Sequence, residues 1–104
     1  MKITVNGREA GTRDTGCALC GSTWGDYYEE IDGQRLFFCC NLCAKGFTNI
    51  VEGIKGAWGP FEDLTIDGSY STGRHCTAMR GDQRHTFFVR FTDNADIEAF
   101  RQEQ

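Results

Sequence analysis

Cysteines are the residues of this chain whose type and spacing could do chemistry, and five of the six lie between positions 17 and 43. Cys17 and Cys20 form a Cys-x2-Cys pair, whose two sulfurs can face one ion from a tight turn. Cys39 and Cys43 are four residues apart and would share one face of a starting helix. We therefore predict a tetrahedral zinc site with the ligands Cys17, Cys20, Cys39 and Cys43.

Cys40 lies beside this predicted site without a place in a four-ligand shell. It could replace Cys39 as the ligand, or it could be a small apolar residue of the core. A third interpretation joins Cys40 to Cys76, His75 and His85 in an additional metal or redox site. His75 and Cys76 are adjacent, however, and on a strand they would face opposite sides, so both cannot easily reach one ion.

A closed shell of four thiolates favours a structural role for the zinc, because catalysis needs an open position for water or substrate. The Cys17-x2-Cys20 spacing is also that of a dithiol redox motif, but such a motif normally lies where a strand meets a helix. That context is missing from the sequence around these residues. We therefore expect a protein that is not an enzyme.

Two hairpins and a helix are expected to position these cysteines. Asn6-Gly7 predicts a hairpin over residues 2–10, and Asp32-Gly33 predicts a second hairpin over residues 22–38. The helix is predicted from Asn41 to Lys55, because the apolar residues of this segment recur at helical spacing, namely Phe47, Ile50, Val51 and Ile54.

The second half of the chain predicts a meander of three strands. The strands are expected at residues 64–66, 74–80 and 83–91, with a polar turn from Ser69 to Gly73. Asp93 and Asn94 offer caps to a closing helix whose inward residues would be Ile97 and Phe100.

The first half also resembles a known group of zinc fingers. The residues that carry the likeness are the Cys17-x2-Cys20 knuckle, the Asp32-Gly33 hairpin ending at Phe38, and the run Cys39-x3-Cys43-x3-Phe47. This pattern resembles the TRASH and YHS group of treble-clef zinc fingers, in which the doubled Cys39-Cys40 is common. The resemblance implies a metal-handling or protein-interaction module that acts through a partner protein. The chain is also similar in layout to a small archaeal family of unknown function, with a zinc site joined to a sheet and two helices.

Taken together, these features predict an α+β fold. It would have a small antiparallel sheet with two helices, joined to a loop-rich, treble-clef-like zinc-binding region. We expect one domain over residues 1–104, with the finger at 11–56 and the meander plus C-terminal helix at 57–104.

The net charge of the chain indicates which kinds of partner it could bind. The formal net charge is −4, and four thiolates with one divalent ion would make it −6, which disfavours binding to a phosphate backbone.

No signal-peptide-like segment and no apolar run of about eighteen residues occurs, so we expect a cytoplasmic protein without membrane contact. In that compartment, cysteines indicate metal or redox chemistry and not disulfides. A nucleic-acid-binding finger and a thiol switch using Cys40 and Cys76 are the rival functions.

Overall fold

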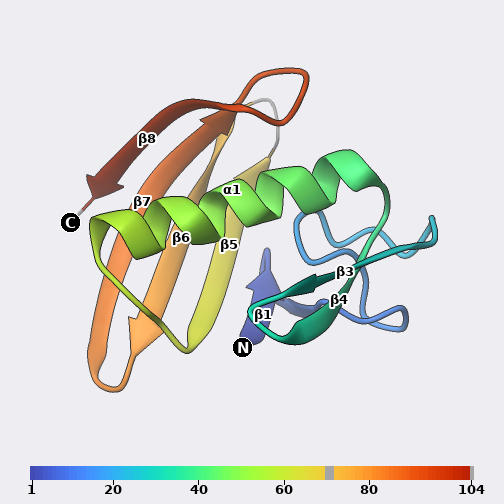
Figure 1. Ribbon diagram of the computed structural model, residues 1–104, viewed down its shortest axis with the longest axis horizontal. Coiled ribbons are helices and arrows are strands. Elements are labelled where there is room, and N and C mark those ends of the chain that lie inside the picture. The colour runs from blue at the N-terminus through green and yellow to red at the C-terminus, as the bar shows by residue number, and fades with distance from the viewer. Residues whose placement is uncertain (70–71, 104) are drawn as a thin grey trace.

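The computed structural model describes residues 1–69 and 72–103, which form eight strands and one helix (Figure 1). The elements follow one another along the chain as β1 (Lys2–Val5), β2 (Arg8–Ala10), β3 (Tyr27–Ile31), β4 (Gln34–Phe38), α1 (Asn41–Ala57), β5 (Asp63–Ser69), β6 (Gly73–Arg80), β7 (Gln83–Phe91) and β8 (Ile97–Glu103).

The main sheet has six strands in the order β2-β1-β5-β6-β7-β8. Its neighbours are antiparallel, except that β1 runs parallel to β5 with Val5 opposite Ile66. The N-terminal hairpin therefore extends the sheet of the second half. β3 and β4 form a separate two-stranded sheet.

Both predicted hairpin turns are confirmed. Asn6 and Gly7 have φ values of +49° and +82°, and Asp32 and Gly33 have φ values of +54° and +78°. Two consecutive residues with positive φ are what a two-residue hairpin turn of the primed type requires, and its twist matches that of the strands. The Asn-Gly and Asp-Gly pairs are therefore sufficient to locate β1–β2 and β3–β4.

The predicted helix is confirmed as α1, which begins at Asn41 and continues to Ala57. The residues of its predicted apolar stripe are all buried, namely Phe47, Ile50, Val51 and Ile54. The helix ends where the chain reaches Gly59, whose φ of +124° is not helical.

The three predicted strands of the second half are confirmed as β5, β6 and β7, and β5 is longer than expected. The polar turn that the sequence predicts at Ser69–Gly73 includes residues 70 and 71, which lie outside the described part of the chain.

The expected C-terminal helix is wrong, and with it the fold of one antiparallel sheet and two helices. Residues Ile97–Glu103 form strand β8, which pairs antiparallel with β7 and places Phe100 opposite Val89. Apolar residues at positions 97 and 100 fit one helical face, but seven residues are too few to separate this pattern from a strand. Pairing decided the outcome, because β8 satisfies the hydrogen-bonding groups on the outer side of β7.

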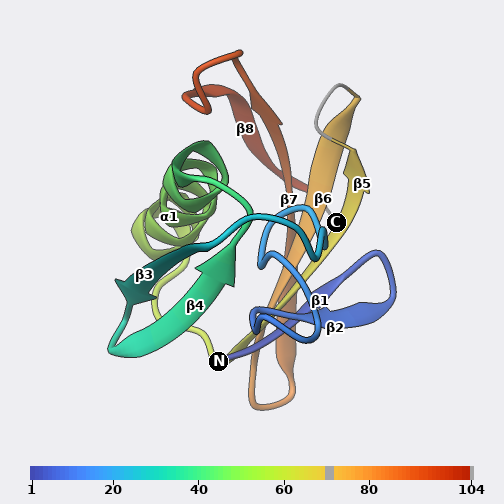
Figure 2. The same cartoon turned by 90° about the vertical axis from the view of Figure 1, so that its right-hand side faces the viewer.

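The core lies between one face of the main sheet and a layer that contains α1 and the β3–β4 hairpin (Figure 2). The sheet contributes alternate residues to this core, among them Ile66, Cys76 and Phe87, which are neighbours across β5, β6 and β7. The cysteine-rich segment belongs to the same core cluster, which includes the buried Cys17 and Cys39.

Candidate metal centre

The four cysteines predicted as ligands come together in space. Their sulfur atoms all lie within 4.8 Å of one another, and we call this group the cysteine cluster (Cys17, Cys20, Cys39 and Cys43). The first pair belongs to the turn between β2 and β3, Cys39 directly follows β4, and Cys43 lies in the first turn of α1. Three segments of local structure therefore determine one small site.

The spacing of the sulfurs fits a metal ion. The Sγ atom of Cys39 lies 3.4 Å from that of Cys43 and 3.6 Å from that of Cys20. A tetrahedral ion with zinc–sulfur bonds of about 2.3 Å holds its sulfurs about 3.8 Å apart. A disulfide needs sulfurs at about 2.05 Å, and all six cysteines are free thiols. The donor set therefore matches one tetrahedral ion and not a pair of disulfides.

The turn at Cys17 is built to stabilise a thiolate. The backbone amides of Leu19 and Cys20 donate to Cys17 Sγ at 3.4 and 3.5 Å, and the amide of Gly21 donates to the carbonyl of Cys17 at 2.8 Å. Gly21 has a φ of +79°, which a residue with a side chain adopts only with strain. The knuckle, by which we mean residues 17–21, thus supplies two amide donors to the sulfur of Cys17.

Backbone hydrogen bonds tie the knuckle to the β3–β4 hairpin. The amide of Ala18 donates to the carbonyl of Phe37, and the amide of Phe37 donates to the carbonyl of Gly11. Phe38 is fully buried, and its ring makes an edge contact with Phe47 of α1 at a centroid distance of 5.6 Å. These contacts hold the sulfurs of Cys39 and Cys43 close to those of Cys17 and Cys20.

Gly25 is a residue of the site that reasoning from sequence missed. Its φ is +92°, and a Cβ atom added there would lie 2.1 Å from the carbonyl oxygen of Cys39. The backbone at Gly25 therefore lies directly against the backbone of a predicted ligand. The only signal in the sequence was a glycine in a loop, which does not reveal a contact with a residue 14 positions further on.

Hydrogen bonds between the sulfurs, burial and like charge together limit the ionisation of the cluster when no cation is bound. The thiol of Cys17 donates to the sulfur of Cys20 and lowers the pKa of Cys20. Hydrogen bonds to the sulfurs of Cys17 and Cys20 raise the pKa of Cys43, and burial raises the pKa of Cys39. Neighbouring sulfurs cannot all carry charge at these distances, because like charges disfavour each other's ionisation. A bound cation would remove this restriction, so metal binding is expected to release protons.

Cys40 lies at the edge of the cluster and is the N-cap residue of α1. Its Sγ atom is 3.9 Å from that of Cys39, and its side chain is half-buried. Burial opposes ionisation of this thiol, but the backbone amides of Cys43 and Leu42 lower its pKa overall. Cys40 is thus a fifth thiol close to the site, outside the group of four sulfurs that surround a common point.

The structure does not bring Cys76, His75 and His85 into a second site. Cys76 is fully buried on the inner face of β6, and burial raises its pKa to about 12. His75 is exposed on the opposite face, where its Nδ1 atom donates to the carboxylate of Glu103 at 2.7 Å. His85 stacks on Trp58 at a centroid distance of 4.2 Å. Within the described residues, the cysteine cluster is the one group of three or more metal-binding side chains.

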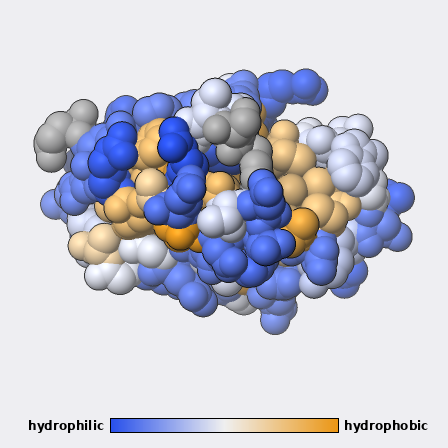
Figure 3. Space-filling view, turned by 90° about the horizontal axis from the view of Figure 1, so that it is seen from above, coloured by the Kyte–Doolittle hydropathy of each residue, from blue (hydrophilic) through white to orange (hydrophobic). Residues whose placement is uncertain are grey.

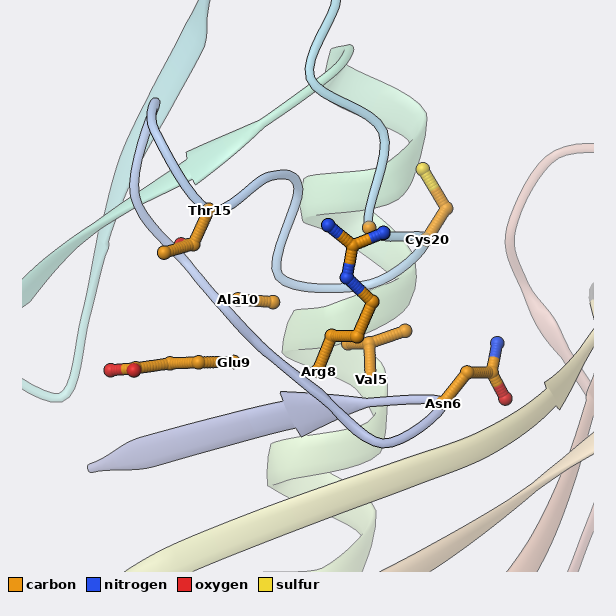
Figure 4. Close-up of a pocket in the computed structure, with 8 residues that line it drawn as sticks. Val5, Asn6, Arg8, Glu9, Ala10, Thr15 and Cys20 are labelled. Atoms are coloured by element: carbon orange, nitrogen blue, oxygen red, sulfur yellow. The ribbon is translucent and has the colours of Figure 1, made fainter.

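A small cavity of about 160 Å³ adjoins the cluster at Cys20. It lies between the knuckle and the N-terminal hairpin (Figure 4). Arg8 extends from the hairpin toward the knuckle, whereas Glu9 points away from it. Cys20 and Cys43 are half-buried, so the cluster is closer to solvent here than at the buried Cys17 and Cys39.

Fold and site together define a small α+β protein with a four-cysteine centre that could hold a metal ion. The model of the Ta0938 family matches residues 14–103, so the chain belongs to the Ta0938 family. Neither a curated protein nor a solved structure matches it. The resemblance to the TRASH and YHS group stays a prediction. In the described part of the chain, no helix has both the length and the apolar character needed to cross a bilayer.

Proposed function

We propose that this protein binds one zinc ion through the cysteine cluster, and that the ion is first of all structural. The observation that carries the proposal is the convergence of four sulfurs, all within 4.8 Å of one another. Tetrahedral sites of four sulfurs select zinc or iron–sulfur chemistry. Zinc is favoured here because the sulfurs are close enough to share a single ion. The residues that would hold it are Cys17, Cys20, Cys39 and Cys43.

The position of the site in the chain supports a structural role. The ion would join the knuckle to the start of α1, and these segments contribute Cys17 and Cys39 to the core cluster. The chain has 13 glycines among its 104 residues, and glycine loses more conformational entropy on folding than other residues. Small domains commonly offset such a loss with a metal. The order of knuckle, hairpin and helix is also that of a treble-clef finger.

We further propose that the protein acts through a protein partner and not as an enzyme. Four thiolates would leave no open position on the ion for a substrate. Among the described residues, the exposed large hydrophobic side chains are Trp24 at 64% and Leu42 at 43% exposure. Both belong to segments that carry the cluster, one after Cys20 and one between Cys40 and Cys43. Figure 3 shows hydrophobic residues reaching the surface in both halves of this face, separated by hydrophilic residues.

A thiol switch is a second candidate, and Cys40 is the observation that favours it. Its sulfur lies 3.9 Å from that of Cys39, and its pKa is lowered by the amides at the start of α1. Cys76, the other thiol named for this role, is fully buried. Alkylation of the metal-loaded protein tests this candidate. Rapid modification of Cys40 alone would support a switch, and an unreactive Cys40 would contradict it.

The test of the main proposal is elemental analysis of the purified, reduced protein together with its stability in a strong chelator. We expect one zinc per chain and a large loss of stability when the metal is removed. Replacing zinc by Co²⁺ should give the absorption of a tetrahedral thiolate site. A protein that is free of metal and equally stable with and without the chelator would contradict the proposal.

A further inference from the structure

A second Cys-x2-Cys pair lies at the start of α1. It consists of Cys40 and Cys43, and the chain enters it directly from β4, which ends at Phe38 (Figure 1). Two thiols of this spacing at the junction of a strand and a helix are the usual setting of a dithiol that is oxidised and reduced. The knuckle has the same spacing but lies in a turn, so the two pairs differ in their setting.

The helix start brings these two thiols together. Cys40 is the N-cap residue, and Cys43 is the third residue of α1. In an α-helix, Cα atoms three residues apart are separated by about 5 Å, which is within the range of about 4.4–6.8 Å that a disulfide requires. The sulfur of Cys40 also accepts a hydrogen bond from the thiol of Cys43. The two sulfurs are therefore in contact before any oxidation.

Cys39 is a poorer disulfide partner for Cys40, although its thiol also donates to the Cys40 sulfur, at 3.9 Å. Cα atoms of adjacent residues are about 3.8 Å apart, which is less than the distance of about 4.4 Å that an unstrained disulfide needs. Of the two thiols that donate to Cys40, Cys43 is thus the one with which it can form a disulfide.

Cys40 can be reached from solvent while an ion is bound. Its side chain is half-buried, and the two residues that follow it, Asn41 and Leu42, are exposed. Cys20 and Cys43 are half-buried too, but in the loaded protein their sulfurs would be bound to the ion. Cys40 would therefore be the accessible free thiol of the loaded protein.

We propose that Cys40 and Cys43 are an oxidation site, at which a low-molecular-weight disulfide links them to each other and thereby releases the zinc ion. The inference rests on the proposed function, because Cys43 is one of the four proposed ligands. It assigns the role of first reacting thiol to Cys40 and that of resolving thiol to Cys43.

The reaction has two steps, in which RSSR stands for the small disulfide. The Cys40 sulfur first attacks RSSR, forms a mixed disulfide with one SR group and expels RS⁻, which takes up the proton of the Cys40 thiol. The Cys43 sulfur then leaves the ion, attacks the Cys40 sulfur and expels the second RS⁻, which takes a proton from water. Two electrons pass from the two cysteines to RSSR, which becomes two thiols.

Oxidation would remove one of the four ligands. Three thiolates would remain for the ion, namely Cys17, Cys20 and Cys39. By the number of ligands alone, this should weaken Zn²⁺ binding about 100-fold or more. Reduction would restore the fourth ligand, so the protein would hold zinc under reducing conditions and give it up to a chelating partner under oxidising ones.

The test treats the reduced, zinc-loaded protein with oxidised glutathione in the presence of a chromophoric zinc chelator. The rate of zinc release is measured, and the disulfides are mapped by mass spectrometry after alkylation of the free thiols. The wild-type protein should release its zinc and contain a disulfide between Cys40 and Cys43. Dithiothreitol should reverse both changes, and the chelator without oxidised glutathione gives the background rate.

Cys40→Ser should keep the wild-type affinity for Zn²⁺ but release the ion in oxidised glutathione at least about 10-fold more slowly, because no accessible free thiol begins the exchange. Cys76→Ala is the matched control. It removes the other free thiol, which is fully buried, and should release zinc at the wild-type rate. Should Cys40→Ser fail to fold, Cys40→Ala gives the same comparison.

Release from Cys40→Ser at the wild-type rate would overturn the inference. The same holds for a wild-type protein that keeps its zinc in oxidised glutathione, or whose disulfide joins Cys17 to Cys20. A wild-type protein that binds no Zn²⁺ would overturn the proposed function instead. Mapping of the oxidised, metal-free protein would then still show whether Cys40 and Cys43 form a disulfide, so the two failures can be told apart.

Discussion

Replacing Cys39 by serine changes one atom at the centre of the cysteine cluster. Cys39 Sγ lies 3.4 Å from Cys43 Sγ and 3.6 Å from Cys20 Sγ, and the residue is buried. Serine keeps the shape of the side chain but offers a hydroxyl oxygen, which is a poor ligand for a thiolate-selecting ion. The substitution therefore removes one of four bonds to the ion and disturbs the fold little otherwise.

The size of the effect follows from the number of ligands. Structural zinc sites in small peptides have apparent binding free energies of about 10–16 kcal/mol, which is about 3 kcal/mol for each of four thiolates. Since every 1.4 kcal/mol is about a factor of ten in Kd, Cys39→Ser should weaken Zn²⁺ binding about 100-fold or more. With free Zn²⁺ well above both dissociation constants, the free energy of unfolding of the loaded protein should fall by about 3 kcal/mol.

Cys40→Ser is the matched control, because it makes the same chemical change one residue further on. Its sulfur is outside the group of four, although it lies 3.9 Å from Cys39 Sγ. Affinities come from competition with a chelator, and stabilities come from urea unfolding with and without zinc. Loss of affinity in Cys40→Ser combined with normal binding by Cys39→Ser would refute the ligand assignment and shift the site by one residue.

Three further substitutions test the structure. Gly25→Ala should weaken metal binding and cost more than the roughly 1 kcal/mol expected of Gly33→Ala, because both glycines have positive φ but only Gly25 abuts the carbonyl of Cys39; equal losses in urea unfolding would contradict this contact. Cys76 has a pKa of about 12 in the folded protein against about 8.5 when unfolded, so its buried thiol stabilises the fold below pH about 8.5 and this contribution disappears as pH rises toward 12. The stability difference between wild type and Cys76→Ala should therefore shrink by about 2 kcal/mol between about pH 8 and pH 10, and a constant difference would show that the thiol is not buried. Phe100→Ala should lower the free energy of unfolding by about 2 kcal/mol, because the ring stacks on Phe87 at a centroid distance of 5.4 Å; a loss as small as that of Glu98→Ala, at an exposed position, would argue against the packing of β8.

Local sequence signals located most elements of the first half of the chain. The Asn6-Gly7 and Asp32-Gly33 turns and helix α1 lie where the sequence predicts them. In each case the signal is short-range, because a turn needs two residues with positive φ and an amphipathic helix needs apolar residues at helical spacing. The gathering of the four sulfurs also agrees with the sequence prediction, because each cysteine pair is placed by a turn or a helix start close to it.

Long-range contacts decided what the sequence could not. β1 pairs with β5 although about sixty residues separate them, and no local pattern indicates a parallel partner. The same is true of Ile97–Glu103, where the open edge of β7 selects a strand over a helix. It is also true of Arg74, which the sequence presents as an ordinary strand residue and which the sheet buries between Gly68 of β5 and Val89 of β7. Residue types and spacing thus determined which atoms could bind a metal, whereas the tertiary structure decided how these atoms and the strands are buried together, because burial depends on segments far apart in the chain.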